Sequence, residues 1–427
     1  MDENLDAPSL EREAAAVLGR ALARSPALHL PGMRDQHRAE VERAIELAWS
    51  ALTAADADGG SPETVAGARF TLVKAHAARA RDARHGAGQL SLGAQRAPTR
   101  EDCDDGWRRV EEIVRVAEAS AVESTRVALL LDAPAARSAA REAETAAKDA
   151  RRIVDERNHA YTFHADPGFS FGEGWYLAAA AVLGGVAIQI EPDKPQTSQA
   201  ERFLRDAGLA TLFQPYRSRP RANKHLPAIV ARAFRADPNA AQRQLRAAFL
   251  GDAPISRAIV DWTAQRLAGT AAGKTVLLWV RHGTHQPARN TKHPELIELA
   301  RRALDAGVVP VLVGDAVRGG ETPAGAVDCT LFWKDALFQG PDMRRTQLRL
   351  FEHMRRTHGL VGQLGVTTAG MDGPALMGLP TVYLTEAPNV RLGSWVGAVP
   401  GYCEIVRGDS HLEQVSRTLR RWAAEAS

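Results

Sequence analysis

The chain of 427 residues is long enough for two or three domains, and its 45% hydrophobic and 25% charged residues are typical of a globular protein. The formal net charge of +3 is small and gives no global reason to expect nucleic acid or an anionic membrane as partner. The three cysteines lie far apart without a CxxC motif, which argues against a disulfide framework or a zinc site and favours a reducing, cytoplasmic location.

No segment of the sequence predicts a membrane span. The N-terminus is acidic where a signal peptide would be basic and then apolar. The longest largely apolar run, residues 175–190, contains a Gly-Gly pair and is shorter than the roughly 18 residues that a spanning helix needs. We interpret it as a helix followed by a strand.

Residues 1–157 are predicted to be an all-α region. Apolar side chains recur every three or four residues, as at Val41, Ile45, Trp49 and Leu52, which is the period of one helix face. Polar stretches with Gly and Pro separate these segments. We expect a helical bundle without visible chemistry, through which the protein could form a homodimer.

The pattern changes near residue 158 to short apolar stretches that alternate with helices, as in a parallel α/β sheet. Residues 158–270 are predicted to form a first Rossmann-like domain, with strands near 160–168, 186–192 and 209–215. Residues 271–427 are predicted to form a second one. Its expected strands are 275–280, 308–313, 360–367 and 380–384, and its expected helices are 293–306, 341–358, 372–378 and 411–424.

The segment VRHG (280–283) ends the first strand of the second domain and permits two interpretations. In a histidine phosphatase, a neutral imidazole, here His282, attacks phosphorus while arginines hold the phosphate oxygens. Such a site also needs a Thr two residues after the Gly, where this chain has His285, and a second histidine. The nearest candidate is His358, which we interpret as part of a helix-capping turn. The phosphatase stays as an alternative.

In the second interpretation, Arg281 neutralises a diphosphate, and Gly283 lets that group approach the backbone. The segment GVTTAGMDG (365–373) supports it, because a small polar turn follows a strand and opens a short helix. Exposed backbone N–H groups near Ala369, Gly370 and Met371 would donate hydrogen bonds to a phosphate, beside the hydroxyl groups of Thr367 and Thr368.

Three motifs together resemble GT-B fucosyltransferases over about residues 160–385. The turn Phe171-Gly172-Glu173-Gly174 opens a helix of small residues, as in the first β-loop-α unit of that group. VRHG is similar to the Nod-factor α-1,6-fucosyltransferase motif, and PVLVGD, ending in Asp315, and LGVTTAG follow in the family's order. Trp279 replaces the family's usual His two residues before the arginine, Glu173 replaces Asn or Asp, and TTAG replaces a more serine-rich turn.

The resemblance implies a GT-B fold and an inverting transfer of a fucose-like sugar from a nucleotide donor, GDP-linked in that family, without a metal or another cofactor. Arg281 would stabilise the departing diphosphate, and Glu173, with Asp166 as the alternative, would remove the acceptor proton. The acceptor stays open among small molecules, glycans and proteins. A non-enzymatic helical scaffold with a degenerate α/β part is a further alternative. The expected substrate-binding residues are Gly172, Gly174, His282, Gly283, Asp315, Thr367, Thr368, Gly370, Met371, Asp372 and Arg391.

Overall fold

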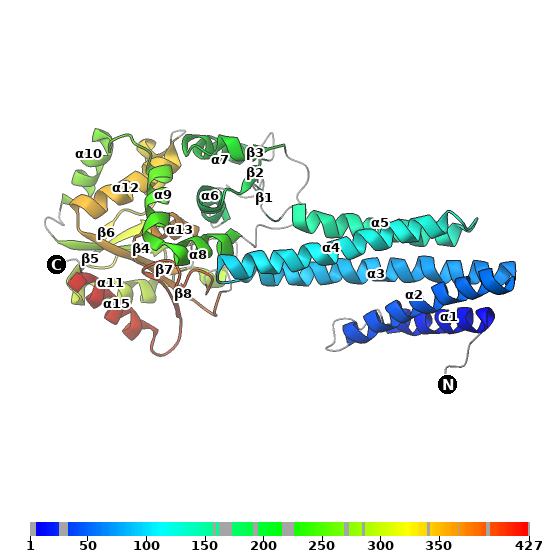
Figure 1. Cartoon of the computed structure of the whole chain (residues 1–427). Coiled ribbons are helices and arrows are strands. Elements are labelled where there is room, and N and C mark those ends of the chain that lie inside the picture. The colour runs from blue at the N-terminus through cyan, green and yellow to red at the C-terminus, as the bar shows by residue number, and fades with distance from the viewer. Residues whose placement is uncertain are drawn as a thin grey trace. The chain divides into compact units, whose positions relative to one another are not determined.

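The chain divides into two compact units, Met1–Arg157 and Asn158–Ser427. Figure 1 shows the chain as a computed structural model. The residues that this structure describes are 6–24, 33–155, 157, 159–161, 173–190, 195–215, 226–268, 273–283, 287–339, 342–366, 368–389 and 393–425.

All regular secondary structure in the described part of the first unit is helical, as predicted. Small side chains, mostly alanine, form its buried seams, which lets the helix backbones approach closely. Ser61 and Thr99 begin two of the helices by accepting a backbone N–H three residues ahead, which is the usual N-cap interaction. The helices are α1 (Ala7–Arg24), α2 (Met33–Asp58), α3 (Pro62–Arg96), α4 (Arg100–Ala128) and α5 (Pro134–Asp155).

A buried histidine in this unit makes its stability depend on pH. His76 on α3 is 4% exposed, and neither ring nitrogen has a hydrogen-bond partner among the described residues. Burial, helped by the charge of Arg79, lowers the pKa of His76 from 6.5 to about 4. The folded unit therefore keeps a neutral imidazole at a pH where the unfolded chain has already bound a proton.

We expect the free energy of unfolding of the first unit to be constant above pH 6.5 and to fall by about 3 kcal/mol as the pH falls from 6.5 to about 4. Hydrogen exchange of α3 amides in the full chain would measure it. His76→Gln should remove the slope, while the exposed His85→Gln should keep it. A slope unchanged by His76→Gln would show that another group is responsible.

The second unit contains two parallel sheets. The smaller has the order β1-β2-β3, and the larger has the order β6-β5-β4-β7-β8-β9. From the central strand β4 the chain proceeds to β5 on one side and later to β7 on the other, so the order reverses between β4 and β7. The strands are β1 (His159–Tyr161), β2 (Ala187–Gln189), β3 (Phe213–Gln214), β4 (Lys274–Val280), β5 (Val308–Gly314), β6 (Val327–Asp328), β7 (Leu360–Val366), β8 (Thr381–Thr385) and β9 (Tyr402–Val406).

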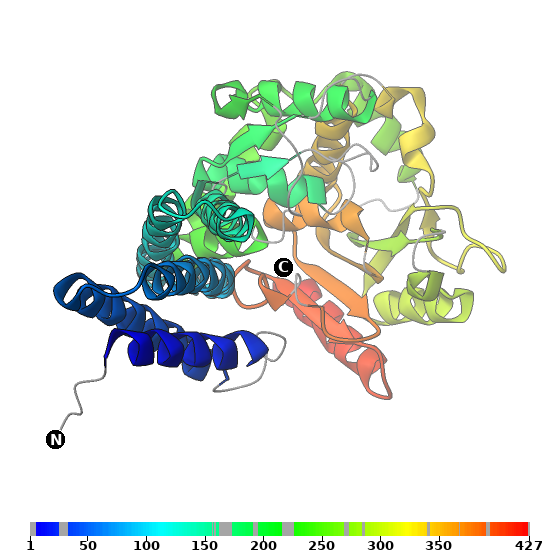
Figure 2. The ribbon, with the colours of Figure 1, turned by 90° about the vertical axis from the view of Figure 1, so that its right-hand side faces the viewer.

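Helices cover both faces of the larger sheet, which explains why β7 is buried at every position. The helices α11 (His293–Asp305) and α15 (His411–Glu425) pack on one face (Figures 1 and 2). The other face and the smaller sheet share one core, so residues 158–427 form a single unit. The remaining helices are α6 (Glu173–Gly184), α7 (Pro195–Asp206), α8 (Leu226–Ala236), α9 (Pro238–Leu250), α10 (Arg257–Arg266), α12 (Met343–Thr357) and α13 (Asp372–Leu376).

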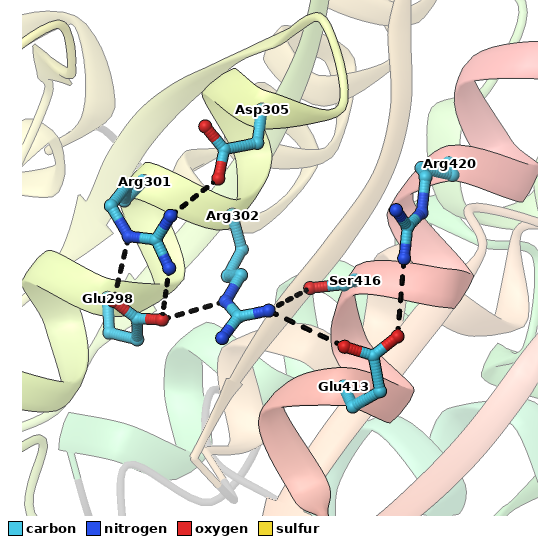
Figure 3. Close-up of polar contacts among 7 residues, drawn as sticks. All are labelled: Glu298, Arg301, Arg302, Asp305, Glu413, Ser416 and Arg420. Carbon is cyan, nitrogen blue, oxygen red and sulfur yellow. Dashed lines mark hydrogen bonds and ion pairs between the residues drawn. The ribbon is translucent and has the colours of Figure 1, made fainter.

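Polar contacts join α11 to α15 on the outer side of the sheet (Figure 3). Arg302 donates to Glu298 on its own helix and, at 3.1 Å, to Ser416 Oγ on α15. Glu298 also accepts from Arg301, and these hydrogen bonds lower its pKa to about 2. Partly exposed pairs of this kind contribute little each, so apolar packing mainly holds α15 in place.

The four strands predicted for the second Rossmann-like domain are observed as β4, β5, β7 and β8, within one or two residues. The α/β class with a parallel sheet is thereby confirmed. The strands β6 and β9 were not predicted. β6 has only two residues, and Glu404 interrupts the apolar pattern of β9. Most of the strand predicted near 160–168 lies outside the described residues.

Candidate functional site

A pocket of about 360 Å³ opens at the carboxyl ends of β4, β5 and β7. Val280 ends β4 and lines the pocket, as do Asp315 after β5 and Thr368 after β7. The helix α12 and Trp175 of α6 provide further walls. This is the edge of the sheet, beside the reversal of strand order, where open parallel sheets bind ligands. Three motifs that are distant in sequence therefore meet at one cavity.

Trp279 forms part of the pocket wall and is anchored by hydrogen bonds. Its indole Nε1 donates to Gln363 Oε1 at 2.8 Å, and Gln363 Nε2 donates to the Met371 carbonyl and to Thr381 Oγ1, both at 2.8 Å. Gly370 lies against the ring, so closely that a Cβ there would be 2.3 Å from Trp279 Cζ3. Trp279 is thus a packing element of the site.

Three side chains hold the VRHG turn, and one of them, Thr291, accepts the Arg281 backbone N–H on its Oγ1 at 2.9 Å. Asp315 Oδ2 accepts the His282 backbone N–H at 2.6 Å. Asn290 Oδ1 accepts from the Gly283 N–H and from Arg281 Nη1, each at 2.9 Å, and Asn290 Nδ2 donates back to the Gly283 carbonyl. These bonds tie the end of β4 to the segment before α11 and to the segment after β5, and so restrain the turn.

Positive charge exceeds negative charge around this turn. Burial and the neighbouring charge of Arg289 lower the pKa of Arg281, whereas Asp315 opposes them. Burial and the charge of Arg318 likewise lower the pKa of His282, so that its imidazole is neutral at pH 7. The charges of three guanidinium groups and of one carboxylate thus act on this turn, and the net positive charge attracts anions.

The structure reveals a site residue that the sequence did not indicate. Arg344 on α12 lines the pocket and is only 6% exposed. Its Nε is fully buried, and within the described ranges its guanidinium has no hydrogen bond or ion pair. Burial lowers the pKa of Arg344 to about 10. No local signal could have found it, because α12 carries several arginines and only its packing shows which one turns inward.

The predicted site residues are only partly brought together. Asp315, Thr368 and Gly370 line the pocket, whereas Arg281, at the carboxyl end of β4, does not and instead donates to Asn290. His282 and Gly283 continue the same turn outside the lining. Of the first motif, Glu173 begins α6 and Gly174 is buried in it. Gly172, Thr367 and Arg391 lie outside the described residues.

Met371 and Asp372 do not have the positions expected of ligand-binding residues. Both are fully buried. The Met371 N–H, expected to be free, donates to the Thr368 carbonyl, and Asp372 accepts a hydrogen bond from the Tyr383 hydroxyl. The expected helix start is a 3₁₀ turn followed by the five-residue α13, so it presents fewer free amides than predicted. These two residues therefore help to pack the site and are not placed to contact a ligand.

The histidine that a phosphatase would need lies at the wrong edge of the sheet. His358 is the C-cap of α12, and Gly359 follows with φ of +54°, so the predicted capping turn is confirmed. His358 precedes β7, whereas His282 follows the parallel strand β4 of seven residues, a length of roughly 23 Å. His353 packs against His358, with ring centroids 5.9 Å apart, on that same side. His358 therefore cannot complete a phosphate pocket with His282.

Neither a metal group nor a membrane helix occurs in the part of the chain that the structure describes. There, no three His, Cys, Asp or Glu side chains are placed to hold a metal ion. Within the same residues, no helix has the length and apolar character to cross a bilayer. Comparison of the chain with protein-family models, curated proteins and solved structures found no match.

Proposed function

We propose that the chain is a glycosyltransferase that moves a sugar from a nucleoside diphosphate donor to an acceptor. The observation that carries the proposal is the convergence of three strand-end motifs on one pocket, through Val280, Asp315 and Thr368. The surplus of positive charge around the VRHG turn, beside this pocket, suits a diphosphate. The resemblance to GT-B fucosyltransferases favours a GDP-linked, fucose-like donor and inversion.

In this proposal, the leaving diphosphate lies between the VRHG turn and the Thr368–Gly370 turn. Arg281 turns from Asn290 toward the phosphate, and guanidinium groups take the role that a metal has in other transferases. Charge that grows on the diphosphate in the transition state is then stabilised by these guanidinium groups. Glu173 is the proposed base, because it begins α6, whose Trp175 lines the pocket.

We expect calorimetric titration to detect GDP binding that is tighter than the binding of UDP or ADP. Arg281→Ala should weaken GDP binding about tenfold, since it removes a charge-assisted hydrogen bond. Arg301→Ala, on the outer face of the sheet, is the matched control and should bind GDP normally. If no nucleotide binds and Arg281→Ala leaves stability unchanged, the transferase proposal fails. Phosphate trapped on His282 by acid quench would instead support the phosphatase.

A further inference from the structure

Arg344 has a buried charge without a countercharge in the described structure. Folded proteins usually pair a buried guanidinium group with a countercharge, because removing an unpaired charge from water is costly. Asp315 is the carboxylate among the described lining residues, but it accepts from the His282 backbone. Burial alone accounts for the lowered pKa of Arg344, with no contribution from a neighbouring charge. The protein thus keeps a costly group aimed at a cavity.

The wall beside Arg344 is aromatic. Trp279 packs on Phe351 with ring centroids 5.8 Å apart, Phe351 on Phe332 at 5.7 Å, and Phe332 on Trp333 at 5.9 Å. All four rings line the pocket. Such a surface accepts a flat, apolar group and excludes water from the nearby guanidinium, which strengthens its attraction for an anion.

We propose that Arg344 is the anion receptor of this pocket and binds the phosphate or carboxylate group of a ligand whose flat part packs on the aromatic wall. The planar fork of a guanidinium matches either anion with two parallel hydrogen bonds. This inference rests on the proposed function in one respect only, because it takes the donor's diphosphate as one such anion. Arg344, rather than Arg281, then makes the main charged contact inside the cavity.

The test is a titration followed by tryptophan fluorescence, since Trp175, Trp279 and Trp333 line the pocket. The phosphate probes are GDP and pyrophosphate, and the carboxylate probes are benzoate and acetate. We expect GDP to bind more tightly than pyrophosphate, or benzoate to bind more tightly than acetate. Pyrophosphate and acetate lack the flat part that would pack on the aromatic wall. Arg344→Met should weaken that binding about 30-fold or more, and Arg344→Lys should weaken it less.

Stability separates an anion receptor from a structural residue. Arg344→Met should melt no lower than the wild type, because it replaces an unpaired buried charge with an apolar side chain of similar size. The adjacent Arg345 is the control. Its guanidinium donates to the Ala248 carbonyl at 3.1 Å and lies over Phe203, so Arg345→Met should melt lower and still bind the ligand.

The outcomes distinguish this inference from the proposed function. Benzoate binding that depends on Arg344, without GDP binding, would sustain the inference and remove the transferase. GDP binding that Arg344→Met leaves intact would overturn the inference and leave the proposed transferase standing. The inference is also overturned if none of the four probes binds at millimolar concentrations, or if Arg344→Met lowers the melting temperature as Arg345→Met does.

Discussion

Trp279→Ala should lower the free energy of unfolding of the second unit by about 4 kcal/mol. The substitution leaves a cavity beneath the pocket and removes ring contacts with Phe351. It also leaves Gln363 Oε1, which is buried, without its indole donor. Denaturant unfolding measures the loss, and the same variant should no longer bind GDP because the pocket wall has collapsed.

A double-mutant cycle with Gly370 tests whether the ring shapes the site. In the wild type, Gly370→Ala would place a Cβ 2.3 Å from Trp279 Cζ3 and should cost about 2 kcal/mol. In the Trp279→Ala background the clash is gone, so the same change should cost far less. Gly393→Ala is the control, because nothing lies within 4 Å of the added Cβ. Additive losses for Trp279 and Gly370 would refute the contact.

Glu352→Gln should lower the free energy of unfolding by about 3 kcal/mol at pH 7. Glu352 on α12 is 3% exposed and pairs with Arg246 of α9 and with Arg355 and Arg356 of its own helix. Arg246 also donates to the Met377 carbonyl at 3.1 Å. The carboxylate thus joins α9, α12 and the segment before β8, behind the pocket wall, and its loss leaves three positive charges together.

The same carboxylate gives a defined pH dependence. Burial by itself would raise the pKa of Glu352, but the hydrogen bond from Arg246 and the charge of Arg355 outweigh it and hold the pKa below 4.5. The stabilisation is therefore complete above pH 4.5 and is lost as the pH falls through the lower folded pKa. Urea unfolding of the wild type and Glu352→Gln should converge in acid.

Glu413→Gln on α15 is the comparison for this second prediction. The Glu413 side chain is 57% exposed and pairs with Arg420 at 3.3 Å, so its replacement should change stability little. Equal effects of the Glu352 and Glu413 substitutions at neutral pH would show that burial does not strengthen the Glu352 cluster.

The strands that position the site were predictable because their signal is local. Residues 275–280 and 308–313 are continuous apolar runs that suit strands covered on both faces. Polar residues follow such strands at one common edge, which is why Asp315, assigned from the resemblance, and Thr368, assigned from the turn after its strand, were expected at the same site. The pocket that they share agrees with this reasoning.

Tertiary contacts changed the roles of other predicted residues. Asp315 supports the His282 backbone, the Met371 N–H is already bonded, and Asp372 is covered by Tyr383. Each of these facts depends on a partner that is distant in sequence or on the exact bend of a turn. Residue type and spacing could propose them as ligand contacts but could not show which polar atoms were already in use.

By itself, the sequence determined the helical first unit, the parallel order of strands and helices in the second, and the sheet edge at which polar turns gather. Only the tertiary structure decided that Arg344 faces the cavity, that Trp279 forms its wall and that Arg281 is held by Asn290. The physical reason is the distance along the sequence over which each signal acts. Apolar periodicity records whether a position is buried, whereas the partner that a buried charge or ring meets is set by the packing of distant elements.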